Sequence, residues 1–284
     1  MISELFAGKR CFVFAGHYGS GKTETAVNFA LDLARGGNRT AIVDFDIVNP
    51  YFRASDARAA LEAGGIRVVA SRYAGSNVDV PALPAEIGGL FEDKGVKAVF
   101  DVGGDDIGAK AVSRYREEFA ANGAAMFFVV NIRRPMTATI PQIERAFADI
   151  QDSARLKFDA IVNNANMLSA TTAADLDEGL DAALALSDAL GLPVAFSVVM
   201  PGDGGGGGGE ARAGKGPAGE GGAGESDGRA GKGPACGSNL ACGSGLARGD
   251  RLPCGDSLAP FAERSARLGI PIFRIGKNIR MDYI

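Results

Sequence analysis

Along the chain, short apolar runs alternate with longer stretches in which apolar and polar positions follow a helical period. Apolar runs of this length predict β-strands buried on both faces, and the helical stretches predict amphipathic helices that cover them. The predicted strands cover residues 11–15, 40–44, 66–70, 96–101, 125–131, 158–163, 194–198 and 271–275. The predicted helices cover residues 22–35, 55–63, 109–121, 139–151, 173–190 and 258–268. This alternation predicts the α/β class, with a mostly parallel sheet and helices on both faces.

One segment interrupts the alternation. Of the 41 glycines in the chain, 21 lie between Pro201 and Ser257, where three leucines are the only large apolar residues. This composition buries too little apolar surface to offset the entropy of ordering the segment, so we expect a disordered insertion. Residues 1–200 are expected to form one domain, which residues 258–284 complete with a last helix and strand.

The overall composition argues against several classes of protein. Lys and Arg number 30 and Asp and Glu 34, a net charge of −4, whereas nucleic-acid-binding domains are commonly basic. No apolar run reaches the ~18 residues of a membrane span, and the first residues lack the basic start of a secretory signal. We therefore expect a cytoplasmic protein with no transmembrane segment and no specific nucleic-acid partner.

The four cysteines are a weak signal. Cys11 falls in the first apolar strand, where packing is its expected role. Cys236, Cys242 and Cys254 lie in the Gly-rich insertion, and their spacing matches no zinc or iron–sulfur signature. Free thiols are expected there, and a metal or redox role is the alternative.

The strongest chemical signal lies between the first strand and the first helix. Residues 16–23, GHYGSGKT, fit the phosphate-binding pattern G-x-x-x-x-G-K-[ST] in the strand-to-helix context that this motif requires. Backbone N–H groups of such a loop surround a phosphate, Lys22 reaches the β- and γ-phosphates, and the Thr23 hydroxyl holds Mg²⁺. The predicted nucleotide contacts are Gly16, His17, Tyr18, Gly19, Ser20, Gly21, Lys22, Thr23 and Glu24.

Acidic residues follow two further strands. Asp44 and Asp46 stand at the end of the second strand, and Asp101 ends the fourth, with two glycines, Asp105 and Asp106 behind it. Carboxyl ends of parallel strands form the edge at which α/β sheets bind ligands. An Asp that ends an apolar strand before glycines is typical of a Walker B acid and a phosphate-sensing loop. Helix capping or turn formation is the alternative role of each acid.

These elements together resemble the MinD/ParA-like (CobQ/CobB/MinD/ParA) branch of P-loop NTPases, over about residues 9–200 and the final helix and strand. The resemblance implies ATP and Mg²⁺ as cofactors. It also implies that Asp46 orients or activates the attacking water beside Lys22. By the same resemblance Asp44 supports the magnesium shell, and Asp101 lies at the magnesium end of the γ-phosphate site.

The phosphate loop departs from that family at one position. Many members carry a Lys directly after the first loop glycine, and it reaches the nucleotide of the other subunit in a dimer. Here His17 stands at that position, followed by Tyr18. His17 could partly replace the lysine as a donor, or it could face solvent or cap the phosphates. Formation of a homodimer around the nucleotide is therefore left open.

The nucleotide base is expected to be adenine. Guanine-binding P-loop proteins commonly carry N-K-x-D, whose Asp accepts from the guanine ring, but residues 163–166 read NNAN, with Asn166 at the Asp position. An Asn amide can donate to N7 and accept from N6 of adenine. Asn163 or Asn164 is the predicted contact, and a polar strand-to-helix turn is the alternative.

Two basic segments leave alternatives open. Arg133 and Arg134 follow the strand at 125–131 and could contact phosphate or a second substrate, or form a solvated turn. The C-terminal residues 271–284 favour a last strand and a short tail over a membrane-binding helix.

The sequence thus predicts a magnesium-dependent ATPase that acts as a nucleotide switch on a protein partner, of the maturation or positioning type. The alternative is a biosynthetic enzyme that transfers the γ-phosphate to a carboxylate, of the cobyrinate-amidation or dethiobiotin-synthesis type. A module that binds ATP without hydrolysis is a third reading, opposed by the presence of Lys22, Thr23, Asp46 and Asp101. The sequence does not identify the partner or small substrate.

Overall fold

The computed structural model describes residues 5–46, 54–70, 85–104, 106–200 and 258–276. The strands are β1 (Cys11–Ala15), β2 (Arg39–Phe45), β3 (Arg67–Ala70), β4 (Val96–Val102), β5 (Ala124–Val130), β6 (Ala160–Asn163), β7 (Val194–Val199) and β8 (Ile272–Arg274). The α-helices are α1 (Lys22–Arg35), α2 (Arg58–Ala63), α3 (Glu86–Glu92), α4 (Asp106–Ser113), α5 (Arg116–Ala121), α6 (Ile140–Ala154), α7 (Ala173–Leu190) and α8 (Ala259–Arg267). Short 3₁₀ turns are η2 (Ala54–Ala57), η3 (Pro135–Thr137) and η4 (Leu168–Ala170).

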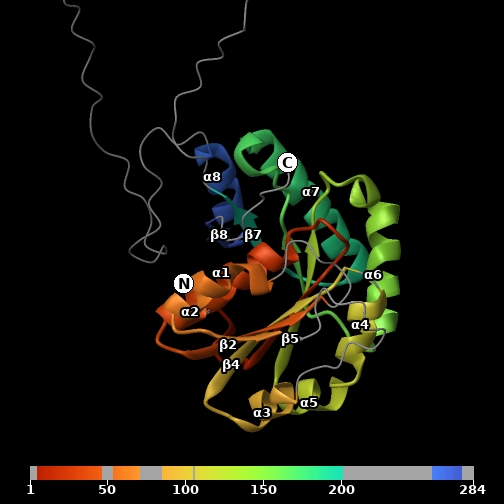
Figure 1. Ribbon diagram of the computed structural model, residues 1–284. Helices are drawn as coiled ribbons and strands as arrows, with labels where there is room; N and C mark the ends of the chain where they lie inside the picture. The colour runs from red at the N-terminus through yellow and green to blue at the C-terminus, as the bar shows by residue number, and fades with distance from the viewer. Residues whose placement is uncertain (1–4, 47–53, 71–84, 105, 201–257, 277–284) are drawn as a thin grey trace, which may run out of the picture. The chain divides into compact units, whose positions relative to one another are not determined.

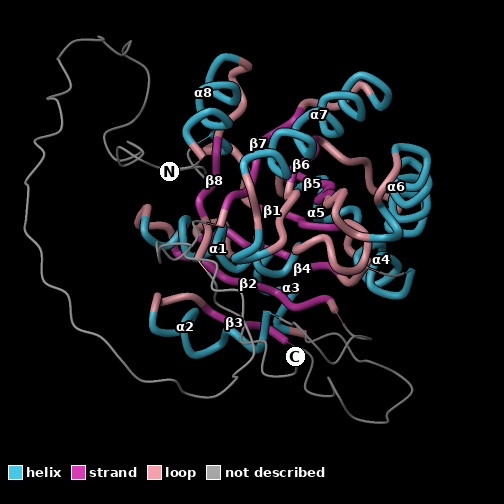
Figure 2. Tube along the Cα trace, turned by 90° about the horizontal axis from the view of Figure 1, so that it is seen from above, coloured by secondary structure: helices cyan, strands magenta, loops and turns pink. Residues whose placement is uncertain are grey.

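The strands form one eight-stranded sheet in the order β3-β2-β4-β1-β5-β6-β7-β8. Each described pair of neighbours is parallel, which confirms the predicted α/β class. Helices lie on both faces of the sheet (Figures 1 and 2). Because the strands are parallel, the loops that follow β1, β2, β4, β5 and β6 all meet at one edge of the sheet.

The two faces of the sheet carry separate apolar layers. Phe12 and Phe14 of β1 pack in the layer that holds α1, and Val13 between them packs in the layer that holds α3 to α6. Phe29 is the centre of the first layer, with ring centroids 4.9 Å from Phe12 and 5.3 Å from Phe14. A fully buried aromatic side chain contributes about 1.5–3 kcal/mol to folding. The packing of Phe29, which lies midway along α1, therefore holds this helix against the sheet behind the phosphate loop.

One predicted helix is wrong, because residues 109–121 divide between α4 and α5. The break falls at Tyr115, whose ring lies 5.6 Å from Phe91 and 6.0 Å from Phe45, measured between centroids. Packing of this ring between core aromatics outweighs continuation of the helix. Helix α3 was not predicted from the sequence, although its buried residues Ile87, Leu90 and Phe91 follow a helical spacing.

The last two strands come from either side of the Gly-rich segment. β7 precedes it and β8 follows it, yet Val198 pairs with Phe273 in one parallel ladder. The proposed disordered insertion, with Cys236, Cys242 and Cys254, lies outside the described residues. Within the described part of the chain, the helices are all too short or too polar to cross a bilayer.

Candidate nucleotide site

The phosphate loop, residues 16–21, joins β1 to α1 and depends on glycine at two of its positions. Gly21 has φ of 83°, a left-handed conformation that other residues rarely adopt, and a Cβ there would lie 2.1 Å from Nδ2 of Asn164. A Cβ on Gly16 would lie 2.3 Å from the backbone oxygen of Val129 in β5. The loop is therefore pressed against the neighbouring strand and loop, with no space for side chains at these points.

Two side chains from later loops hold the outer side of the phosphate loop. Arg134, which follows β5, donates from Nε to the carbonyl of Gly19 at 2.8 Å. Asn164, which follows β6, donates from Nδ2 to the carbonyl of Ser20 at 2.6 Å. Two successive carbonyls are thus occupied from outside the loop. The first-turn N–H groups of α1, which have no intrahelical partner, remain available for a phosphate.

The acids predicted from the sequence converge on the start of α1. Lys22, Thr23, Asp44, Asp46 and Asp101 are all buried, and Asp101 is 0% exposed. Asp44 and Asp101 are register partners in β2 and β4. The backbone N–H of Asp46 donates to Oδ1 of Asp44 at 3.0 Å, so the Asp44 side chain holds the backbone at Asp46 close to the end of β2.

Burial raises the pKa of Asp101 well above its usual range. The charge of Lys22 and the hydroxyl of Thr23 oppose this rise, while the charges of Asp44 and Asp46 add to it. Neither carboxylate oxygen of Asp101 has a hydrogen bond of normal geometry within the described residues. Buried polar atoms without partners are rare in folded proteins, so this carboxylate fits a place reserved for a cation and its water shell.

The described residues contain no cluster of three His, Cys, Asp or Glu side chains able to hold a metal by themselves. Mg²⁺ commonly keeps several waters and is bound by one or two protein groups together with substrate phosphates. The Thr23 hydroxyl and the carboxylates of Asp44 and Asp101 have the hard oxygen donors that such an ion requires.

The loop after β4 lies directly on the phosphate loop. A Cβ on Gly104 would stand 2.5 Å from the backbone nitrogen of Tyr18 and 2.8 Å from its Cα. The two backbones are therefore in contact, which the pair of glycines after Asp101 permits. Asp105 lies outside the described residues, so the predicted phosphate-sensing role of this loop remains a prediction at that position.

The asparagines after β6 have different surroundings. Asn163 donates from Nδ2 to the Ser197 hydroxyl at 3.2 Å and accepts the Ala165 N–H at 3.3 Å, so both ends of its amide are used within the protein. Oδ1 of Asn164 is buried and has no hydrogen-bond partner among the described residues. Oδ1 of Asn166 accepts the N–H of Leu168 at 2.7 Å. Of the three amides, that of Asn164 is the one in contact with the phosphate loop.

The two neighbouring arginines also differ. Arg133 forms ion pairs with Asp175 at 2.8 Å and Glu178 at 2.6 Å, both on α7. Hydrogen bonds from Thr172, reinforced by Arg133, lower the pKa of Asp175. Arg133 therefore binds α7 through these ion pairs, whereas Arg134 contacts the phosphate loop. The sequence predicted that Arg133 and Arg134 lie at the sheet edge that binds ligands. It did not predict that Arg133 would pair with α7 while Arg134 contacts the phosphate loop.

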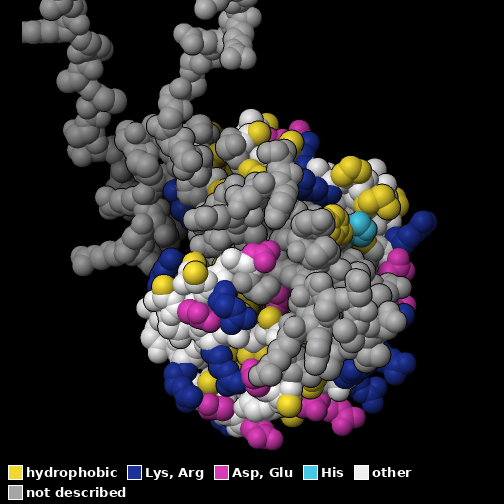
Figure 3. All heavy atoms as spheres, viewed as in Figure 1, with side chains coloured by type: hydrophobic (Ala, Val, Ile, Leu, Met, Phe, Trp, Pro, Cys, Tyr) yellow, Lys and Arg dark blue, Asp and Glu magenta, His cyan; other side chains and the backbone are white. Residues whose placement is uncertain are grey.

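His17 and Tyr18 stand at the outer side of the loop. His17 is partly buried and its Nδ1 lies 3.2 Å from the carbonyl oxygen of Tyr18, and the single His of the chain is visible at the surface in Figure 3. Tyr18 is 54% exposed. Met136 and Met167, in the loops after β5 and β6, are also exposed. Three of the loops at this edge of the sheet therefore each expose a large side chain with apolar surface.

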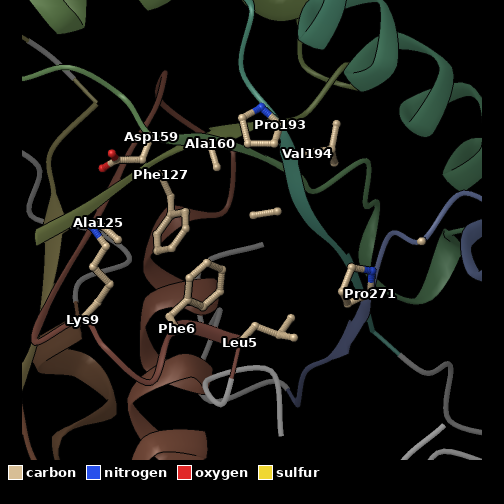
Figure 4. Close-up of a pocket in the computed structure, with 12 residues that line it drawn as sticks. Leu5, Phe6, Lys9, Ala125, Phe127, Asp159, Ala160, Pro193, Val194 and Pro271 are labelled. Atoms are coloured by element: carbon tan, nitrogen blue, oxygen red, sulfur yellow. The ribbon is translucent and has the colours of Figure 1, made fainter. Parts of the chain in front are cut away.

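A cavity of about 390 Å³ lies elsewhere in the molecule (Figure 4). It is lined by residues at the amino ends of the strands, including Ala125, Ala160 and Val194, and by Phe6 near the start of the chain. This is the sheet edge opposite to the phosphate loop, so the cavity is not part of the candidate site.

Comparison with known proteins gives distant structural similarities. No family model and no curated protein matches the chain. Among solved structures, the cell division protein FtsY of Thermotoga maritima aligns with a TM-score of 0.48 and 17% identity, over 67% of this chain and 62% of that one. The signal recognition particle 54 kDa protein of Aeropyrum pernix K1, solved with GDP, aligns with a TM-score of 0.45 and 17% identity, over 69% of this chain and 45% of that one. The chain spans less than two thirds of either protein.

The fold itself is defined by the arrangement of loop and sheet. The phosphate loop joins β1 to the first helix of an all-parallel sheet, and Asp101 ends the adjacent strand β4. This chain has the fold of a P-loop NTPase.

Proposed function

We propose that the chain is a cytoplasmic, magnesium-dependent ATPase of the MinD/ParA-like branch and acts as a nucleotide switch on a protein partner. The observation that carries the proposal is the fully buried Asp101 carboxylate, whose oxygens make no hydrogen bond of normal geometry among the described residues and which lies near Lys22, Thr23 and Asp44. Burial of an ionised carboxylate is costly unless a cation or hydrogen-bond donors compensate for it. The group therefore supports a site built for Mg²⁺ and a nucleotide.

The residues that would hold Mg²⁺ are Thr23, Asp44 and Asp101, with the phosphates and water completing the shell. When bound, the ion neutralises negative charge that develops on the phosphates. Lys22 is the protein's own cation at the β- and γ-phosphates. The N–H groups of the loop and of the first turn of α1 orient the phosphate chain.

Hydrolysis requires a water to attack the terminal phosphorus while the bond from that phosphorus to the bridging oxygen breaks. The products are ADP and inorganic phosphate, and the water gives up one proton. Asp46 is the proposed residue for orienting this water and accepting its hydrogen bond, as the family resemblance implies. Its buried place beside Asp44, close enough to affect the charge of Asp101, supports this role.

Adenine is proposed as the base from the sequence after β6. Asn166 stands in place of the Asp that guanine-binding P-loop proteins commonly carry, so the acceptor for the guanine ring is absent from that position. The Nδ2 of Asn164 donates to the Ser20 carbonyl and its Oδ1 is buried, so among the described residues this amide supports the phosphate loop.

The switch is proposed from the contact between Gly104 and Tyr18. Because these two backbones touch, a phosphate in the loop can bias the position of the chain after β4, and a partner protein or a second copy can read that position. The alternative, phosphorylation of a carboxylate substrate, is favoured by one feature. His17 replaces the lysine that the dimeric switches carry.

Phosphate release by the purified protein tests the proposal. We expect Mg²⁺-dependent release from ATP, slower release from GTP, and acceleration by a protein partner rather than by small carboxylates. Release that depends on a carboxylate, with formation of an acyl phosphate, would favour the biosynthetic alternative. Absence of nucleotide binding in calorimetry would overturn the proposal.

A further inference from the structure

The side chain of Asn131 joins two loops at the edge of the sheet that carries the phosphate loop. Asn131 directly follows β5 and is 1% exposed. Its Nδ2 donates to the backbone carbonyl of Asn166, in the loop after β6, at 3.0 Å. Its Oδ1 accepts the backbone N–H of Arg133, in the loop after β5, at 2.9 Å. Both ends of one buried amide are thus used to hold the two loops together.

The backbone of Asn131 also closes the loop after β5. Its carbonyl accepts the Thr137 hydroxyl at 2.7 Å and the Arg134 N–H at 3.3 Å. Thr137 is buried as well, and its own N–H donates to the Arg134 carbonyl at 3.0 Å. The turn that carries Arg134 is therefore built on Asn131.

The two loops that Asn131 joins are the ones that hold the outer side of the phosphate loop. Arg134, after β5, donates to the carbonyl of Gly19, and Asn164, after β6, donates to the carbonyl of Ser20. A change at Asn131 therefore reaches the phosphate loop through two hydrogen bonds at successive carbonyls.

The hydrogen bond from Asn164 also sets the direction of an N–H group. The Ser20 carbonyl and the Gly21 N–H belong to one peptide unit, and in a planar trans peptide these two groups point in opposite directions. Because Asn164 holds the carbonyl on the outer side, the Gly21 N–H is turned toward the inner side of the loop. Gly21 is the N-cap of α1, the place at which helices bind phosphate.

We infer that Asn131 is a positioning residue of the proposed nucleotide site, which keeps the phosphate loop in its binding conformation through Asn164 and Arg134. The inference rests on the proposed function. Without this support a nucleotide must itself order the loop, and that cost lowers affinity. The supported carbonyls lie on the outer side of the loop, away from the acids after β2 and β4, so the effect should be the same for a diphosphate and a triphosphate.

Asn131→Asp is the variant that tests this role. It keeps an oxygen to accept the Arg133 N–H but replaces the donor to the Asn166 carbonyl with a second acceptor. Calorimetric titration gives the affinities for MgADP and MgATP, phosphate release gives kcat and KM, and thermal unfolding gives the stability.

Asn122→Ala is the matched control. Asn122 lies just before β5, at the edge of the sheet opposite to the phosphate loop, and it is also buried. Its Oδ1 accepts hydrogen bonds from Arg10 and from Lys94, the latter at 2.7 Å. This variant should lower the melting temperature and leave both nucleotide affinities at the parental values.

We expect Asn131→Asp to weaken binding of MgADP and of MgATP by about tenfold each and to raise KM by a similar factor. The kcat should stay within about twofold of the parental value, because the interaction supports ground state and transition state alike. In a double-mutant cycle with Asn164→Ala the two losses should not add. Once the Asn164 amide is absent, Asn131→Asp should weaken binding by less than about threefold further.

Parental affinities in folded Asn131→Asp would overturn the inference. So would full additivity with Asn164→Ala, or a loss confined to kcat. If Asn131→Asp does not fold, Thr137→Val decides, since it removes only the hydroxyl bond to the Asn131 carbonyl. It should then give a smaller but equal loss for both nucleotides, and parental affinities there would overturn the inference.

The same measurements separate this inference from the proposed function. If the parent protein binds no nucleotide, the proposed function fails and this inference with it. If the parent binds and hydrolyses ATP while the variants at Asn131 and Thr137 bind as tightly as the parent, only the inference is rejected.

Discussion

Asp44 and Asp101 are register partners on the adjacent parallel strands β2 and β4. Their strand neighbours Ile42 and Val99, two residues earlier, belong to the apolar layer that holds α1, so both acids point to the face where the phosphate loop enters its helix. Two like charges at paired, buried positions destabilise the nucleotide-free protein. The same pairing brings two carboxylates to one place, as a divalent cation requires.

Asp101→Asn should stabilise the nucleotide-free protein. Burial raises the pKa of Asp101 in the folded state, so the folded protein holds a proton that the unfolded chain loses first. The stability that the proton gives is present below the ordinary pKa and is lost as pH rises through the raised value. Scanning calorimetry should show a melting temperature about 2–4 °C above that of the parent near neutral pH, with a smaller difference in acid. Equal melting temperatures at each pH would contradict this.

Lys22→Ala should lower the affinity for ATP by about tenfold or more, because it removes a charge-assisted contact to the β- and γ-phosphates. Calorimetric titration measures the effect, and circular dichroism checks that the fold is intact. Lys97, a partly buried lysine on β4 away from the loop, provides the matched control as Lys97→Ala. Unchanged ATP affinity in Lys22→Ala would show that the phosphates bind elsewhere.

Asp46→Asn and Thr23→Ala should separate hydrolysis from metal binding. The first keeps a side chain of the same size but removes the carboxylate that positions water, so turnover should fall by about 100-fold or more with ATP affinity nearly unchanged. The second removes the proposed hydroxyl ligand, so the dependence of ATP affinity on Mg²⁺ should weaken. If Asp46→Asn hydrolyses ATP at the parental rate, Asp46 does not position the water, and another acid must do so.

Gly104→Ala should disturb the contact between the loop after β4 and the phosphate loop. Its Cβ would stand 2.5 Å from the backbone nitrogen of Tyr18, and a backbone atom cannot move aside cheaply. We expect slower hydrolysis and weaker ATP binding, measured by phosphate release and calorimetry. Gly88→Ala, at an α3 position with nothing within 4 Å of the added carbon, is the control and should be neutral or stabilising. Equal hydrolysis rates and ATP affinities in Gly104→Ala and Gly88→Ala would show that the close approach of Gly104 to Tyr18 is not needed for activity.

Replacement of residues 203–256 by a short Gly/Ser linker should leave folding and ATP binding intact. The strands on either side, β7 and β8, pair directly in the sheet, and the cost of closing a loop depends only weakly on its length. The melting temperature should shift by only a few degrees. Loss of a bound metal or of ATPase activity would instead assign a function to the segment and to its three cysteines.

The sequence by itself determined the features that depend on neighbours a few positions apart. The strand at Cys11–Ala15, the loop at Gly16 and the helix at Lys22–Arg35 follow from local apolar periods and from a motif eight residues long. The same local signals placed Asp44 and Asp101 at strand ends. Because the fold is parallel, strand ends alone were enough to predict that these acids share an edge.

The tertiary structure decided which groups meet across that edge. Arg134 reaches Gly19 over 115 positions and Asn164 reaches Ser20 over 144, and no local period encodes such contacts, since they depend on the order of β1, β5 and β6 in the sheet. Packing of the Tyr115 ring likewise divided a helix that its sequence pattern would continue. The burial of Asp101, whose oxygens make no hydrogen bond of normal geometry among the described residues, also depends on the tertiary structure. The solvation of a carboxylate is set by everything packed around it, and local sequence specifies only a small part of those surroundings.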